Sequence, residues 1–223
     1  MFPAEALTFL RGLARHNDRE WFNPRKETFE AKLKAPMLAL IESINGQLMD
    51  FAPEHVTDPK KALYRIYRDT RFSADKTPYK THVAAIFPRK GHEKHAGAGF
   101  YFQLSTKGVG VAAGLYGPGP DELRAVRTFL AENHVKFRAA LKAPEKLMGK
   151  LTGASAVRMP KGFDPESPAA DLLKMKQWLF WQELDVKLAT SPKLQAEIMK
   201  RFRSAAPVLD MLNSGLKRRP MLD

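Results

Sequence analysis

"GFYFQLSTKGVGVAAGLY" (residues 99–116) contains two short runs rich in β-branched, aromatic and other apolar residues. Only Thr106, Lys107 and Gly108 separate the run at 99–105 from the run at 109–116, a length typical of a compact hairpin connection. Two similar runs precede them, at 62–68 and 82–88, with turn-forming residues in between. These four segments predict an antiparallel β-meander.

Helical patterns precede the meander. Residues 3–15 repeat apolar side chains at helical spacing, and a longer helix is expected from Pro24 to Leu48 with a kink at Pro36. Between the two, Asn17 is expected to cap a short helix, because Glu20 follows at the spacing of a capping box. The N-terminal quarter of the chain is therefore predicted to be helical.

The chain after the meander is predicted to be mainly helical as well. Helices are expected at 120–132, 134–143 and 145–151, and a final helix from Pro192 to Leu212 with a kink at Pro207. Residues 169–185 fit a helix or a strand. We expect a helix to about Lys174 and a strand from Gln177 to Leu184.

The predicted fold class is α+β, with an antiparallel β-meander of about four to five strands packed against N-terminal and C-terminal helices. One domain is expected over residues 1–223. Its parts are a helical region at 1–56, a β-rich region at 60–117, and a mainly helical region at 118–223 that includes an extra strand near 177–185.

Composition excludes several classes of protein. The 223 residues contain no cysteine, which removes disulfides, thiolate metal sites and cysteine nucleophiles. No apolar run approaches the roughly 20 residues that span a bilayer, and the N-terminus lacks the pattern of a signal peptide. We therefore expect a cytoplasmic protein with no membrane partner and no cofactor. The oligomeric state stays open.

The charge balance points to an anionic partner. Lys and Arg number 37 against 24 Asp and Glu, for a formal charge of +13. Between Lys60 and Lys94 there are ten basic and three acidic residues, an excess of seven in one short segment. Its centre is "RIYRDTRFSADKTPYKTH", residues 65–82.

Strand alternation divides the charges of this segment. Arg65 and Asp69 would share one face of a strand, joined by Arg71 if the extended backbone continues. Nearby guanidinium groups lower the pKa of Asp69, which suits it to orient arginines rather than to act as a general acid. Arg68, Lys76 and Lys80 have no obvious partner in the segment. We expect these three to converge on one concave surface and to hold an anion.

Other polar residues complete the predicted site. Tyr79 and His82 are expected to supply hydrogen bonds, and Lys161 and Lys174 to approach from the C-terminal half. The predicted ligand-binding residues are thus Arg65, Arg68, Asp69, Arg71, Lys76, Tyr79, Lys80, His82, Lys161 and Lys174. No residue pattern identifies a catalytic group. If a reaction occurs, electrostatic stabilisation of an anion is the chemistry that these residues favour.

A metal site is not expected. The segment "GHEKHAGAG" (residues 91–99) holds His92 and His95, but one residue, not two, separates Glu93 from the second histidine. That spacing differs from the metalloprotease pattern, and no third ligand is evident.

The segment "YRIYRDTRFSADKTPYKTH" (64–82), together with "NDREWF" (17–22) and "MPKGF…DLLKMK" (159–176), resembles the family called domain of unknown function 2461 (DUF2461). The match extends from about Leu7 to Leu212. The resemblance implies no particular activity, but it marks motif positions, and exposed charged motif residues more often bind than pack. These positions are Asn17, Arg19, Glu20, Trp21, Phe22, Arg65, Arg68, Asp69, Arg71, Phe72, Asp75, Lys76, Pro78, Tyr79 and Lys80, with Lys161, Gly162 and Lys174 in the later motif.

Three functions stay open on the sequence. The first is binding of a small phosphorylated or carboxylated molecule by the basic strand and loop. The second is nucleic-acid binding, in which the same residues contact phosphates and the tyrosines stack on bases, although no known nucleic-acid-binding signature is present. The third is a structural or interaction protein in which the charges pair with one another for stability.

Overall fold

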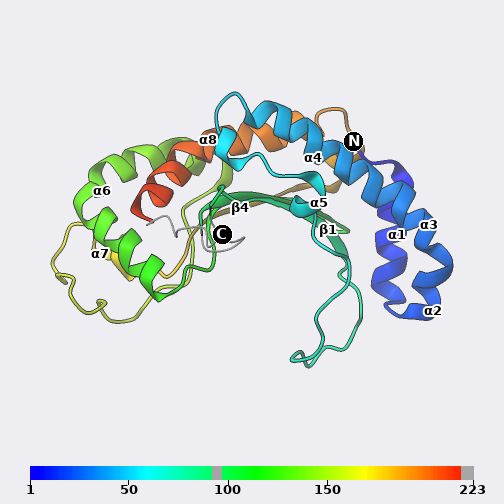
Figure 1. Cartoon of the computed structure of the whole chain (residues 1–223), viewed down its shortest axis with the longest axis horizontal. Coiled ribbons are helices and arrows are strands. Elements are labelled where there is room, and N and C mark those ends of the chain that lie inside the picture. Colours follow the sequence, from blue (N-terminus) through cyan, green and yellow to red (C-terminus); the bar gives the residue numbers. More distant parts are fainter. Residues whose placement is uncertain (92–96, 217–223) are drawn as a thin grey trace.

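The computed structural model describes residues 1–91 and 97–216 (Figure 1). It contains one four-stranded sheet in the order β1-β2-β3-β4, and each strand is antiparallel to its neighbour. The strands are β1 (His82–Phe87), β2 (Gly99–Ser105), β3 (Gly108–Leu115) and β4 (Trp178–Asp185). The α+β class and the antiparallel meander predicted from the sequence are therefore confirmed.

Helices cover one face of this sheet and lie at both ends of the molecule. They are α1 (Ala4–Arg15), α2 (Arg19–Phe22), α3 (Lys26–Phe29), α4 (Ala35–Leu48), α5 (Pro59–Ala62), α6 (Pro120–Met148), α7 (Ala170–Lys174) and α8 (Leu194–Gly215). Short 3-10 or π turns are η1 (Asn23–Arg25), η2 (Glu30–Lys34), η3 (Pro53–His55) and η4 (Val186–Thr190). In Figure 1, α4 and α8 cover one face of the sheet, α6 and α7 lie at one end of the molecule, and α1 to α3 lie at the other.

The core lies between the sheet and α8. Side chains alternate along a strand, so Phe100, Phe102 and Leu104 of β2 all point to this side and are buried. Phe202 of α8 stacks on Phe100 with ring centres 4.7 Å apart, and it meets Phe87 of β1 edge-on at 5.9 Å. Burying these rings is the main apolar contribution that holds α8 against the sheet.

The opposite face of the sheet carries no helix within the described residues (Figure 1). It is the concave side, bounded by the helices at the two ends and by the long loop around residues 66–80. No helix in the described part of the chain has the length and apolar character needed to cross a membrane.

The strand predicted at 62–68 is wrong. Only two isolated bridges form there, between Leu63 and Ala85 and between Tyr67 and Tyr79. The two bridges are four residues apart along Leu63–Tyr67 but six residues apart along Tyr79–Ala85. Two residues of the second segment therefore bulge from the ladder. The segment is extended but does not make a regular strand.

The predicted start of the second helix is corrected by one residue. Asp18 caps α2, and its carboxylate accepts a hydrogen bond of 2.7 Å from the backbone N–H of Trp21. Asn17 instead bonds to the backbone of Tyr79, 62 residues away. A tertiary contact has therefore taken the side chain that local spacing assigned to the cap.

Two predicted helical regions also differ in continuity. The three helices expected between 120 and 151 form one helix, α6, which continues through Pro144. The helix expected from Pro24 to Leu48 is divided into η1, α3, η2 and α4. Pro36 lacks an N–H to donate to the preceding turn, and the π-type turn η2 directly before α4 accommodates this.

Candidate functional site

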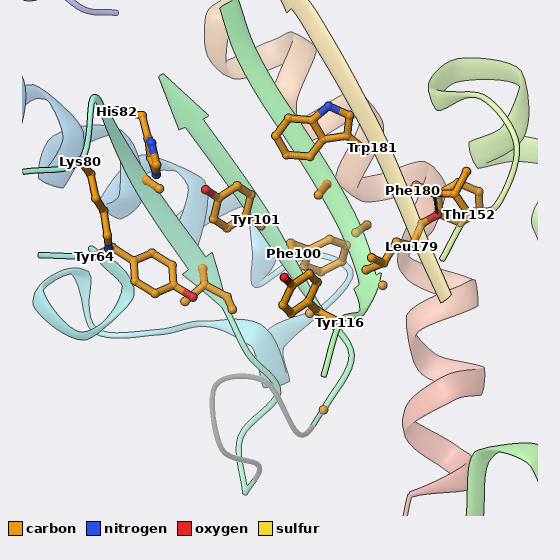
Figure 2. A pocket seen from close by; sticks show the side chains of 17 residues that line it. Tyr64, Lys80, His82, Phe100, Tyr101, Tyr116, Thr152, Leu179, Phe180 and Trp181 are labelled. Carbon is orange, nitrogen blue, oxygen red and sulfur yellow. Dashed lines mark hydrogen bonds between the residues drawn. The ribbon is translucent and has the colours of Figure 1, made fainter. Parts of the chain in front are cut away.

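The open face of the sheet is hollow because the residues on that face of its central strands are small. In β3 the larger side chains Val109, Val111 and Leu115 point into the core, whereas Ala112 and Gly114 point to the open face. Ala84 of β1 and Gly99 of β2 continue this surface of small residues. The result is a cavity of about 520 Å³ on the concave side (Figure 2).

Six aromatic residues line this cavity: Tyr64, Phe100, Tyr101, Tyr116, Phe180 and Trp181. Tyr101 of β2 and Trp181 of β4 both pair across strands with Ala112, which lies between them. Their ring centres are 6.4 Å apart, and those of Tyr64 and Tyr101 are 6.2 Å apart. Figure 2 shows these rings arranged around the small residues of the sheet.

The position of the Trp181 ring requires a glycine at residue 110. A Cβ atom at Gly110 would lie 2.5 Å from a Trp181 ring atom, so the indole rests directly on the backbone of β3. Trp181 is 44% exposed even so. An exposed indole held flat on a strand, beside a cavity, is a surface on which a ring of a ligand can stack.

Polar groups gather at the β1 side of the cavity. Lys80 and His82 both line it, and the Lys80 ammonium lies 4.9 Å from the centre of the Tyr64 ring, within the range of a cation–π contact. Burial, together with the charge of Lys80, lowers the pKa of His82 below its usual value. His82 is therefore held in its neutral form at neutral pH.

Tyr101 adds a hydroxyl group to this region. Its hydroxyl donates a hydrogen bond of 2.7 Å to Oε1 of Gln103, two residues along β2. Burial raises the pKa of Tyr101, and burial also raises the pKa of Tyr64. Both phenols thus remain protonated at neutral pH, and the Tyr101 hydroxyl, whose proton bonds to Gln103, can accept a hydrogen bond in the cavity.

Four of the predicted site residues lie elsewhere, in the loop that leads back toward β1. Arg68 forms an ion pair with Asp75 and donates to the Thr77 hydroxyl at 2.6 Å. Asp69 pairs with Arg71 at 2.8 Å, and the Lys76 ammonium donates to the carbonyl of Thr70 at 2.9 Å. None of Arg68, Asp69, Arg71 and Lys76 lines the cavity on the open face.

The prediction that Arg68 and Lys76 lack partners is therefore wrong. The partner of Arg68, Asp75, lies seven residues away in sequence, and only the folded loop brings the two together. Hydrogen bonds from Arg68 lower the pKa of Asp75 to about 2, and those from Arg71 lower the pKa of Asp69 to about 2. The lowered pKa of Asp69 agrees with the sequence prediction.

The remaining predicted residues are dispersed. Tyr79 is 2% exposed, and its ring stacks on Phe22 at 4.1 Å, so it belongs to the core. Arg65 lines a different, smaller cavity beside Lys60. Lys174 ends α7, which lies at one end of the molecule, away from the loop around residues 66–80 (Figure 1). Neither Lys161 nor Lys174 lines the open-face cavity.

Convergence of Arg68, Lys76 and Lys80 on one concave surface is thus not observed. Of the predicted residues, Lys80 and His82 line the open-face cavity. Sequence reasoning missed its aromatic residues and its small residues. The signal was present in "VGVAAGLY", where glycine and alanine alternate with larger residues, a pattern that leaves one face of a strand bare.

A metal centre is not seen among the residues that the structure describes, which contain no group of three or more His, Asp or Glu side chains suited to hold one. His92 and His95, considered above for this role, lie outside the described residues.

Comparison with known proteins gives one finding. A family model described as "Conserved hypothetical protein (DUF2461)" matches residues 5–211. Searches of the curated proteins and of the solved structures found no match.

Proposed function

Because the chain belongs to the DUF2461 family, whose description names no ligand, we propose a function from the geometry of the open-face cavity. We propose that the protein binds a small molecule with a flat, largely apolar body and one carboxylate or phosphate group. The body would lie on Ala112 and Gly114, and the anionic group would lie against Lys80 and His82.

The observation that carries this proposal is the open-face cavity itself. Its volume of about 520 Å³ falls in the range of ligand pockets, which are typically apolar with a few well-placed polar groups. Sheet faces that merely meet solvent usually carry larger polar side chains rather than Ala84, Gly99, Ala112 and Gly114. Ala112 and Gly114 leave space on the sheet for a planar group beside the Tyr101 and Trp181 rings, which contact each other at 6.4 Å.

The polar end supports an anionic group on the ligand. Lys80 contributes a positive charge, His82 gains one on protonation, and the Tyr101 hydroxyl is within the same cavity. Hydrogen bonds to charged partners are stronger than those between neutral groups, so a carboxylate or phosphate would be oriented toward β1. The proposal concerns binding and assigns no reaction.

A thermal-shift panel of aromatic carboxylates and aromatic phosphate monoesters tests this function. A ligand at about 100 times its dissociation constant should stabilise the fold by roughly 2.7 kcal/mol. The variant Ala112→Leu places extra carbon atoms on the cavity floor and should abolish the shift. The control is Ala139→Leu, the same substitution at an exposed position of α6, which should respond like wild type.

Two results would overturn the proposal. One is that no member of the panel stabilises wild type. The other is that Ala112→Leu and Ala139→Leu respond equally to a ligand that does, since binding would then lie outside the cavity.

Nucleic-acid binding is the second candidate, and one observation favours it. Phe72 is 96% exposed in the loop at residues 66–80, which we call the basic loop. The Arg71 guanidinium lies 5.7 Å from the centre of the Phe72 ring. Aromatic rings flanked by cations stack on unpaired bases, while Arg and Lys contact phosphates. We propose this loop as the contact surface if the protein binds single-stranded nucleic acid.

Fluorescence anisotropy with a labelled single-stranded oligonucleotide separates the two candidates. Binding through the loop should weaken in Phe72→Ala and decline steeply with salt, because several phosphate contacts release counterions. It should be unaffected by Ala112→Leu. If the oligonucleotide does not bind at low salt, or if Phe72→Ala binds it as wild type does, this second candidate is wrong.

A further inference from the structure

A second cavity, of about 250 Å³, lies between η2 and residues 60–67, which comprise the end of α5 and the extended segment that follows it. Four basic side chains line it: Lys26, Lys34, Lys60 and Arg65. Glu30 is the one acidic residue of its lining, and it forms an ion pair of 2.8 Å with Lys34. Within the described part of the chain, Lys26, Lys60 and Arg65 form no ion pair, so the cavity carries unneutralised positive charge.

Backbone hydrogen bonds fix the orientation of the extended segment. The N–H of Tyr64 donates to Ala84, the carbonyl of Ile66 accepts from Lys80, and the N–H of Arg68 donates to Pro78, so these three residues turn their polar groups toward residues 78–84. Because backbone groups alternate along an extended chain, the amides of Arg65 and Tyr67 point the other way. No backbone partner for these two amides is found among the described residues.

The wall opposite this edge is the π-type turn η2. Glu30 and Lys34 are its first and last residues, and both line the cavity. Turns of this type widen a helix locally and occur frequently at functional sites. Here the turn presents Lys34 toward the extended segment, while the buried rings of Phe22 and Phe29 line the same cavity.

We propose that this cavity is an anion site that takes a diphosphate or a comparable phosphate-rich group. Four cations and one carboxylate leave a local charge that matches a polyanion better than a single carboxylate. The two backbone amides add donors of the kind that surround bound phosphates. Its volume is about half that of the open-face cavity and suits a compact ion rather than an aromatic body.

The site is separate from the one proposed above, although the two adjoin. Tyr64 is common to both linings, and Lys80 lines only the open-face cavity. A diphosphate in the second cavity would therefore not depend on Lys80, which allows the two sites to be tested independently.

Isothermal titration of inorganic pyrophosphate, at low ionic strength, tests this proposal. Wild type should bind, and Lys60→Ala should weaken the affinity by about tenfold, the usual effect of losing one charge-assisted hydrogen bond. Lys61→Ala is the matched control, because Lys61 is exposed on the same helix, α5, and does not line the cavity. Lys61→Ala and Lys80→Ala should both bind as wild type does.

Three outcomes would overturn the site. The first is that wild type does not bind pyrophosphate at millimolar concentration. The second is equal weakening by Lys60→Ala and Lys61→Ala, which would indicate a diffuse effect of surface charge. The third is loss of binding in Lys80→Ala with Lys60→Ala unchanged, which would place the anion in the open-face cavity.

Discussion

The side chain of Asn17 makes two hydrogen bonds to the backbone of Tyr79. Its amide nitrogen donates to the Tyr79 carbonyl at 2.9 Å, and its amide oxygen accepts from the Tyr79 N–H at 3.0 Å. This pair ties the turn between α1 and α2 to the end of the basic loop. It also explains why two motif positions that are far apart in sequence, Asn17 and Tyr79, belong to the same structural unit.

Replacement of Asn17 by Ala should lower the free energy of unfolding by about 1–3 kcal/mol, because it leaves a partly buried donor and acceptor without partners. Urea denaturation measures this. Asn23→Ala, at an exposed position nearby, should change the value by less than about 0.5 kcal/mol. Equal effects of the two substitutions would contradict this role of Asn17.

Glycine at position 114 is required by the strand pairing that forms the cavity floor. Its φ is +142°, and an added Cβ would lie 2.0 Å from the carbonyl oxygen of Trp178. Gly114→Ala should therefore destabilise the protein by more than about 2 kcal/mol. Gly46→Ala, in α4 with open space around it, should instead stabilise by about 0.5–1 kcal/mol. Thermal unfolding should show a lower melting temperature for Gly114→Ala and a higher one for Gly46→Ala than for wild type.

Protonation of His82 should lower the free energy of unfolding at acidic pH. The folded pKa of His82 lies below its usual value, so the unfolded chain binds the proton more tightly. The stability linked to this group is complete above about pH 6.5, the usual pKa of histidine, and is lost as the pH falls below it. Urea denaturation at pH 7.5 and 5.5 should show a smaller loss for His82→Gln than for wild type. An equal loss in the two proteins would argue against this environment for His82.

The basic loop should open when its internal ion pair is broken. Asp75→Asn removes the charged partner of Arg68, so trypsin should cleave after Arg71 and Lys76 several times faster, while the melting temperature changes little. Asp171→Asn breaks a comparable exposed pair with Arg138 at the other end of the molecule and serves as the control. Unchanged cleavage in Asp75→Asn would show that the ion pair does not hold the loop.

Much of the architecture was predictable from local patterns. The runs at 82–88, 99–105 and 109–116 are strands, as is the segment near 177–184, because alternating apolar residues and short turns specify strands without reference to distant parts of the chain. The helical regions on both sides were predictable for the same reason. Their exact continuity was not, as α6 shows by continuing through Pro144.

The candidate site was less predictable. The sequence shows a concentration of positive charge between Lys60 and Lys94, and we predicted that this charge forms one anion-binding surface. In the structure this charge is divided among three places. They are the loop around Phe72 with its internal ion pairs, the open-face cavity with Lys80, and the second cavity with Arg65. The division accompanies the irregular pairing of residues 63–67 with residues 79–85, in which two residues of the second segment bulge, and no residue pattern marks this bulge.

The sequence by itself thus determined the α+β class, the hairpins at 82–116, the excess positive charge and the low pKa of Asp69, because each depends on residues close together along the chain. Only the tertiary structure decided that Asp75 neutralises Arg68, that Tyr79 is a core residue, and that Ala112 lies between Tyr101 and Trp181. These relationships depend on which strands pair and in which register. Register is set by burial of one face of the whole sheet rather than by any single segment.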